Sequence, residues 1–181
     1  MMYKTHLATS IAAGVVVSKV LSFPFTIGYL SGVVIGSLLP DIDHPRSFIG
    51  RRFIVLSKAI NKEFGHRGLT HSLIFWLILS VLLSAHINYF TLGVSFGYLF
   101  HIFGDFFSRS GVPLLLPYDK KRFKSFITYK TASFSELVIF YFSIFIGLFF
   151  ILNNEIISPL IESSSDLMRN LLQIVISLLR K

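Results

Sequence analysis

Three short motifs in this sequence, LPDIDHP, HRGLTH and HIFGD, combine carboxylates with imidazoles. Side chains of these types bind divalent metal ions, transfer protons in catalysis, or form buried hydrogen bonds. One further histidine lies alone near the start of the chain. The candidate metal ligands from the motifs and this histidine are His6, Asp41, Asp43, His66, His71, His101 and Asp105.

The spacing within two of the motifs suits metal ligation. His101 and Asp105 are four positions apart, so on a helix they lie on one face, one turn from each other. A carboxylate and an imidazole in this arrangement can hold one divalent ion or two neighbouring ions. In the other motif, Gly68 allows a sharp turn, so that the rings of His66 and His71 can both point inward.

The LPDIDHP motif allows two arrangements. Its prolines stop a helix, and in extended chain alternate side chains point to opposite sides. Asp41 and Asp43 could therefore bridge two ions, or one could bind a metal while the other orients a neighbouring histidine. The sequence has no cysteine, so all donors are nitrogen and oxygen, which suits zinc, manganese or iron. Mixed sites of this kind often hold two ions, and we expect two, most simply zinc.

The composition indicates a membrane protein. Of the 181 residues, 53% are apolar and 14% are charged, and 20 are phenylalanine, whereas a soluble domain has about 25% charged residues. A water-soluble core of this size cannot bury so many aromatic rings, so we expect a bilayer to cover them. The net charge of +8 suits anionic lipid headgroups. The sequence has no basic run interleaved with aromatic residues, the pattern that would indicate nucleic acid binding.

We therefore predict an all-α fold, a polytopic membrane helical bundle of about five transmembrane helices, since about 20 apolar residues cross a bilayer. Gly28, Gly32 and Gly36 have the spacing that lets helix backbones pack closely. Residues 1–152 form the membrane-embedded domain, and residues 153–181 form an acidic loop and an amphipathic C-terminal helix. The predicted spans are residues 5–22, 25–40, 71–88, 92–108 and 135–152.

The basic residues predict the orientation of these spans. Segments 41–70 and 109–134 each carry six of the 17 Lys and Arg residues, and two spans separate the segments, so both lie on one side. The positive-inside rule makes this side cytoplasmic, together with the N-terminus. In this topology the candidate ligands from four helices gather at the cytoplasmic face.

This convergence favours a functional site over simpler explanations. A single HxxxD pair is commonly a structural hydrogen bond, and an Asp before Pro is commonly part of a turn. Ionisable groups at membrane depth are costly, however, and several of them in one place usually serve a site.

The motifs LPDIDHPRS, HRGLTHS and HIFGDFFSRSGVPLLLPY, with a histidine on the first helix, together resemble the YdjM-type family of LexA-regulated, membrane-bound proteins classed as metal-dependent hydrolases. The resemblance covers about His6 to Pro117. It implies a location in a prokaryotic inner membrane and a distant similarity to zinc-dependent phospholipase C enzymes, which are all-helical. It also implies that the seven candidates above are metal ligands. The late glutamate ligand of those enzymes has no clear match, and Glu136 is the nearest candidate.

The leading hypothesis is hydrolysis of a phosphoester in a lipid substrate that arrives from the bilayer. Asp43 or His44 could transfer the proton. Arg46 and Arg67 could hold an anionic group, or they could be ordinary basic residues of a cytoplasmic loop. Two alternatives remain open: a divalent-metal or proton transporter or channel, and a structural membrane protein whose helices are joined by a metal staple.

Overall fold

The computed structural model describes residues 1–152 and 157–179, and all regular structure within these ranges is helical. Glu155, at the start of the predicted acidic loop, lies outside the described residues. Two isolated bridges occur in the loop between α5 and α6. The α-helices are α1 (Tyr3–Val20), α2 (Ile27–Gly36), α3 (Ile54–Phe64), α4 (Leu73–Leu83), α5 (Tyr89–Phe106), α6 (Phe134–Leu152) and α7 (Ile157–Leu179). The 3₁₀ turns are η1 (Leu39–Asp43), η2 (Leu69–His71) and η3 (Ser84–His86).

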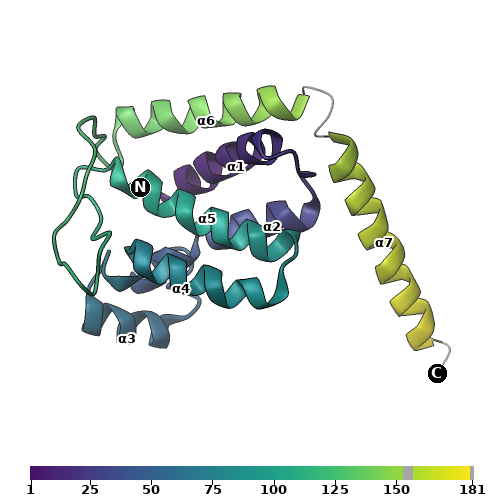
Figure 1. Ribbon diagram of the computed structural model, residues 1–181, viewed down its shortest axis with the longest axis horizontal. Helices are drawn as coiled ribbons and strands as arrows, with labels where there is room; N and C mark the ends of the chain where they lie inside the picture. The colour runs from purple at the N-terminus through teal and green to yellow at the C-terminus, as the bar shows by residue number, and fades with distance from the viewer. Residues whose placement is uncertain (153–156, 180–181) are drawn as a thin grey trace.

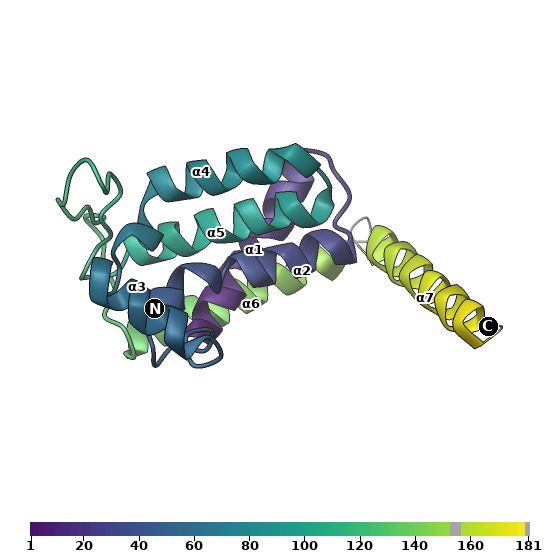
Figure 2. The same ribbon diagram turned by 90° about the horizontal axis from the view of Figure 1, so that it is seen from below.

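Helix α5 is the centre of the bundle and packs against α1, α2 and α4. Helix α6 lies on the outer side of α1, and α3 lies at the end of the bundle beside η1 (Figure 1). Viewed from below, α4, α5 and α2 lie side by side, and α7 extends away from them (Figure 2). Helix α7 contacts the N-terminal end of α2, where the Ile27 amide donates a hydrogen bond to Ser163 Oγ at 3.0 Å.

Glycines hold α2 and α5 unusually close together. A Cβ atom on Gly32 or Gly36 would overlap the backbone of α5, and a Cβ atom on Gly93 or Gly97 would overlap the backbone of α2. Two glycines on each helix therefore lie against the backbone of the other, which is the close approach predicted from the glycine spacing. Gly28 is different, because a Cβ atom there would make only ordinary contacts.

The predicted spans are helical, but most are shorter or less apolar than expected. Among the described residues, only α6 is both long and apolar enough to cross a bilayer. Only 11% of its most apolar stretch is buried within the protein. Helices α2 and α4 have 10 and 11 residues, or about 15 Å each at 1.5 Å per residue, half of a 30 Å hydrocarbon core. The all-α class is confirmed, and the five-span topology stays a prediction.

The bundle buries a polar cluster beside its hydrophobic core and exposes many large apolar side chains. His6, His71, His101 and Asp105 are fully buried, while large apolar side chains are exposed along α4, α6 and α7. An exposed apolar surface of this extent needs a cover other than water. The predicted amphipathic C-terminal helix is part of α7, which starts about ten residues earlier than its apolar pattern indicates.

Candidate metal centre

The candidate ligands meet at one end of the bundle because several helices begin or end there. His6 lies in the second turn of α1, and His101 and Asp105 occupy the last two turns of α5. Asp41 lies in η1, after α2 has ended at Gly36. His71 is the last residue of η2, two positions before the start of α4.

Local sequence signals fix the ends of these elements. Pro40 occupies the first turn of η1, where its missing N–H costs nothing. Ser72 caps α4 by accepting a hydrogen bond from the Phe75 amide at 3.0 Å, so the helix begins after His71 and not before it. His71 is therefore held in the turn η2, from which its side chain reaches the end of α5.

Four of these side chains converge through their nitrogen and oxygen atoms. The Nε2 atoms of His71 and His101 are 3.3 Å apart. Asp105 Oδ2 lies 3.5 Å from His71 Nε2 and 3.8 Å from His101 Nε2. Asp41 Oδ1 lies 3.8 Å and 3.7 Å from the same two nitrogens. Two imidazoles and two carboxylates thus surround one small space.

His6 closes this space from α1. Its ring stacks on the His101 ring with centroids 3.6 Å apart and an angle of 6° between the planes, and its Nε2 lies 3.5 Å from Asp105 Oδ1. Two sets of three ligand atoms each fall within 4.8 Å of one another: those of His6, Asp41 and His101, and those of His71, His101 and Asp105. The sets share His101, so they form one continuous cluster.

The outer hydrogen bonds fix which nitrogen of each ring is free. His101 Nδ1 lies 2.6 Å from the carbonyl oxygen of Ser37, which can only accept, so Nδ1 carries the proton. His71 Nδ1 lies 3.1 Å from a carboxylate oxygen of Asp43 and is a donor for the same reason. In their neutral forms both rings therefore direct the lone pair of Nε2 into the shared space, as metal-binding histidines do.

A cation in the shared space would stabilise this arrangement. A proton on Nε2 of His71 or His101 could form a hydrogen bond between these two nitrogens, but other buried polar atoms nearby would still lack a partner. Among the described residues, both nitrogens of His6 and Oδ2 of Asp105 are buried without a hydrogen-bond partner. Buried polar atoms without partners are costly, and a divalent cation would satisfy several of them at once. The residues present therefore fit a metal.

Asp43 lies behind the cluster, where it orients other residues. Besides His71, it accepts hydrogen bonds from the Arg67 amide at 2.9 Å, from Thr70 Oγ1 at 2.7 Å and from His66 Nδ1 at 2.9 Å. Burial alone would raise the pKa of Asp43, but the hydrogen bonds from His66, His71 and Thr70 outweigh it and hold the pKa well below its usual range. Of the two arrangements considered for LPDIDHP, this geometry matches a carboxylate that orients a histidine.

His66 and His44 form a separate pair at the surface. Their ring centroids are 4.5 Å apart, and 41% of the His66 side chain is exposed. Burial and then the nearby His66 lower the pKa of His44. His66 contacts Asp43 and the edge of the His71 ring, with the two ring centroids 6.0 Å apart, and its assignment as a direct ligand stays a prediction.

The two candidate anion-binding arginines differ in their surroundings. Arg46 is exposed on the turn after η1. The Arg67 side chain is 9% exposed, and its Nη2 donates to Asp105 Oδ1 at 2.8 Å. Its Nη1 donates to Ser108 Oγ at 2.7 Å and also to Ser110 Oγ. Arg67 therefore holds one oxygen of Asp105 and leaves the other directed at the histidines.

Glu136, the candidate for a late glutamate ligand, is occupied elsewhere. It is fully buried, and its carboxylate accepts hydrogen bonds from the amides of Met2, at 2.5 Å, and Ala132, at 2.6 Å. It thereby joins the start of α6 to the start of α1. Sequence reasoning missed the roles of Ser37 and Thr70. The Ser37 contact comes from the backbone and leaves no signal in the sequence, whereas Thr70 lies beside His71 in the HRGLTH motif.

A family model described as "YdjM inner membrane protein" matches residues 1–175, which include every residue of the cluster. The chain belongs to the YdjM family. An uncharacterized protein, YvsG of Bacillus subtilis, is 37% identical over 138 residues, covering 75% of this chain and 85% of that protein. The inner membrane protein YdjM of Escherichia coli is 45% identical over 91 residues, covering 46% of each. No solved structure matches the chain. Membership in this family confirms the resemblance noted in the sequence.

Proposed function

We propose that this protein is a metal-dependent hydrolase of the bacterial inner membrane that cleaves a phosphoester of a phospholipid or another lipid phosphate. The observation that carries the proposal is the shared space between the Nε2 atoms of His71 and His101 and the carboxylates of Asp41 and Asp105. Imidazole nitrogens that face one another beside carboxylates are typical of a site built around a divalent cation.

The metal would be held by the five converging side chains, and their donors suit zinc, with manganese and iron as further candidates. We propose two ions, because sites with mixed carboxylate and imidazole donors often hold two. When bound, the ions supply Lewis acidity, which lowers the pKa of a water and stabilises charge on phosphoryl oxygens. The converging residues are His6, Asp41, His71, His101 and Asp105.

The surrounding residues have separate roles in this proposal. Asp43 holds His71, and the Ser37 carbonyl holds His101, so both rings are fixed before a substrate arrives. Asp43 already accepts four hydrogen bonds, which leaves His44 as the residue better suited to transfer a proton between the site and water. Arg46, which is exposed, holds the anionic headgroup.

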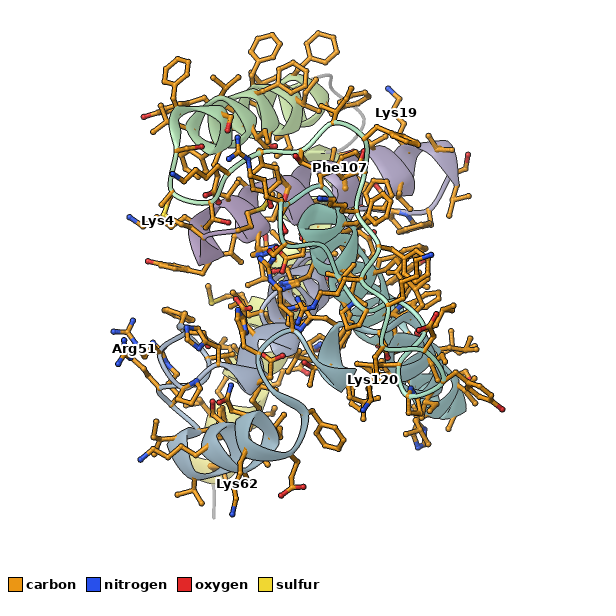
Figure 3. The ribbon with its side chains drawn as sticks, turned by 90° about the vertical axis from the view of Figure 1, so that its left-hand side faces the viewer. Lys4, Lys19, Arg51, Lys62, Phe107 and Lys120 are labelled. Atoms are coloured by element: carbon orange, nitrogen blue, oxygen red, sulfur yellow. The ribbon has the colours of Figure 1, made fainter. Side chains whose placement is uncertain are left out.

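The proposal includes the orientation predicted from the sequence. The protein would cross the membrane several times, with its N-terminus and both basic loops in the cytoplasm. Its support is the position of the cations. In Figure 3, Lys4, Arg51 and Lys62 project outward at the edge of the molecule, around a centre at which nitrogen and oxygen atoms gather. A lipid substrate could then reach the site laterally, from the cytoplasmic leaflet.

Elemental mass spectrometry of the detergent-purified protein tests this proposal, in parallel with the double variant Asp41→Ala/His101→Ala. We expect divalent metal in the natural chain and its loss from a variant that remains folded by circular dichroism. ³¹P NMR of phospholipid mixtures incubated with the metal-loaded protein then tests for hydrolysis. A protein that takes up no metal after gentle purification and reloading would overturn the hydrolase proposal.

A further inference from the structure

A basic groove adjoins the candidate metal centre. It lies between the C-terminal end of α3 and the loop that follows α5, and its volume is about 320 Å³. The backbone of Gly68 and the apolar side chains of Phe64 and Leu116 form part of its wall. Three cations outnumber one acid among its charged lining residues, which are Glu63, Arg67, Lys120 and Arg122.

Arg67 connects this groove with the metal centre. The same side chain that lines the groove donates to the candidate metal ligand Asp105 at 2.8 Å. Its two terminal nitrogens are occupied by Asp105 and two serines, but its Nε is buried and has no hydrogen-bond partner among the described residues. A buried guanidinium N–H without an acceptor is rare in a native protein, and a bound oxyanion could supply one.

The backbone at Arg67 is also unusual. Its φ of 54° lies in the left-handed region, which residues with a Cβ atom rarely adopt. The Asp43 carboxylate holds this conformation by accepting a hydrogen bond from the Arg67 amide. Strained residues that are held in this way concentrate at binding and catalytic sites.

The other two cations have free capacity to bind an anion. Lys120 and Arg122 are exposed. Arg122 donates to the His66 carbonyl oxygen at 3.5 Å, which is the limit of a hydrogen bond. An oxyanion with several acceptor oxygens would offer both side chains stronger, charge-assisted hydrogen bonds.

We propose that this groove binds a phosphate group, with Lys120 and Arg122 as its main cations and Arg67 as the residue that joins it to the metal centre. This inference rests on the proposed function and adds a phosphate-binding subsite to it. The phosphate could belong to a lipid headgroup or to a soluble phosphate, because both present the same oxygens. Lys120 and Arg122 then position a substrate or product phosphate beside Asp105.

The same loop provides a matched control. Lys124 and Lys130 are exposed and basic but do not line the groove. The variants Lys120→Ala/Arg122→Ala and Lys124→Ala/Lys130→Ala each remove two positive charges from one loop. If the cations only attracted anions nonspecifically, both pairs would have the same effect.

Isothermal titration calorimetry of the detergent-purified full chain tests the groove, with inorganic phosphate, dihexanoyl phosphatidic acid and dihexanoyl phosphatidylcholine as probes. We expect Lys120→Ala/Arg122→Ala to weaken phosphate binding by about tenfold or more and the control pair by about twofold or less. Tighter binding of phosphatidic acid than of inorganic phosphate identifies a lipid headgroup as the ligand, and equal binding identifies a soluble phosphate. Equal weakening in both pairs would overturn the proposal, and so would the absence of binding in the natural chain.

A second variant separates the groove from the metal. The same titration with Asp41→Ala/His101→Ala, which lacks the metal ligands, should retain phosphate binding within about threefold, because electrostatic contacts with the groove remain. Loss of binding in this variant would mean that phosphate binds to the metal, which would overturn the proposal that the groove binds phosphate. Metal content measured on the same samples tests the hydrolase proposal separately. Metal-loaded protein that does not bind phosphate would contradict the phosphate-binding groove but not the hydrolase proposal.

Discussion

His71 and His101 face each other through their Nε2 atoms at 3.3 Å, while the Nδ1 atom of each ring is held by an acceptor, Asp43 or Ser37. The two rings come from different elements, η2 and α5, and neither can rotate without losing its outer hydrogen bond. The proposed metal site would therefore be organised before an ion binds. Much of the cost of ordering the ligands is met during folding, which favours metal affinity.

Asp43 should affect metal affinity without being a ligand in the described geometry. The change Asp43→Asn removes the charge that orients His71 and turns an acceptor into a possible donor at Nδ1. We expect zinc affinity to fall by about 10- to 100-fold, as is typical when an outer-sphere carboxylate is lost. Competition with a chromogenic chelator measures this change. The control Asp119→Asn alters an exposed carboxylate outside the cluster, and equal affinities in the two variants would contradict the assigned role.

His6 can be tested as a ligand separately from its packing. The change His6→Phe retains an aromatic ring to stack on His101 but removes both nitrogens, which lack hydrogen-bond partners. We expect metal affinity to fall, while the metal-free protein keeps or gains stability because two unsatisfied polar atoms are removed. Chelator competition and thermal unfolding measure the two effects. The exposed residue His86 provides the control His86→Phe, and unchanged metal binding in His6→Phe would exclude His6 as a ligand.

Local periodicity explains why part of the site could be predicted from the sequence. His101 and Asp105 are four residues apart, and helix geometry alone puts them on one face. A break in the helix by the LPDIDHP motif could also be predicted, because proline disrupts a continuing helix. The contact between Ser37 and His101 joins residues 64 positions apart through a backbone carbonyl, and no residue type signals such a contact.

The outer residues and the span lengths were harder to predict for different reasons. The choice between Asp41 and Asp43 as the residue nearer to His101 depends on how η1 turns, and the sequence left both arrangements open. Hydropathy measures apolar content, whereas a helix ends where its hydrogen bonding stops. The second predicted span, 25–40, therefore includes a turn, and only ten of its residues form α2.

The close approach of α2 and α5 should be sensitive to a single methyl group. In Gly36→Ala, the new Cβ would overlap the Val94 carbonyl oxygen and the Tyr98 amide. We expect a loss of about 1–3 kcal/mol in unfolding free energy, as for other overpacked sites. The change Gly28→Ala, on the same helix, meets only ordinary contacts and should be neutral or stabilising. Thermal unfolding in detergent compares the two, and equal stabilities would contradict the close packing.

Metal binding should stabilise the protein through its buried ligands. Zinc at about 100 times its dissociation constant should add about 2.7 kcal/mol to the unfolding free energy, if the unfolded chain does not bind it. For a chain of this length, that corresponds to a rise in Tm of roughly 5–11 °C. Chelation should reverse the rise, and Asp41→Ala/His101→Ala should abolish it. Unfolding followed by circular dichroism, with and without zinc, measures the effect. A zinc response that persists in this variant would show that the stabilising ion binds elsewhere.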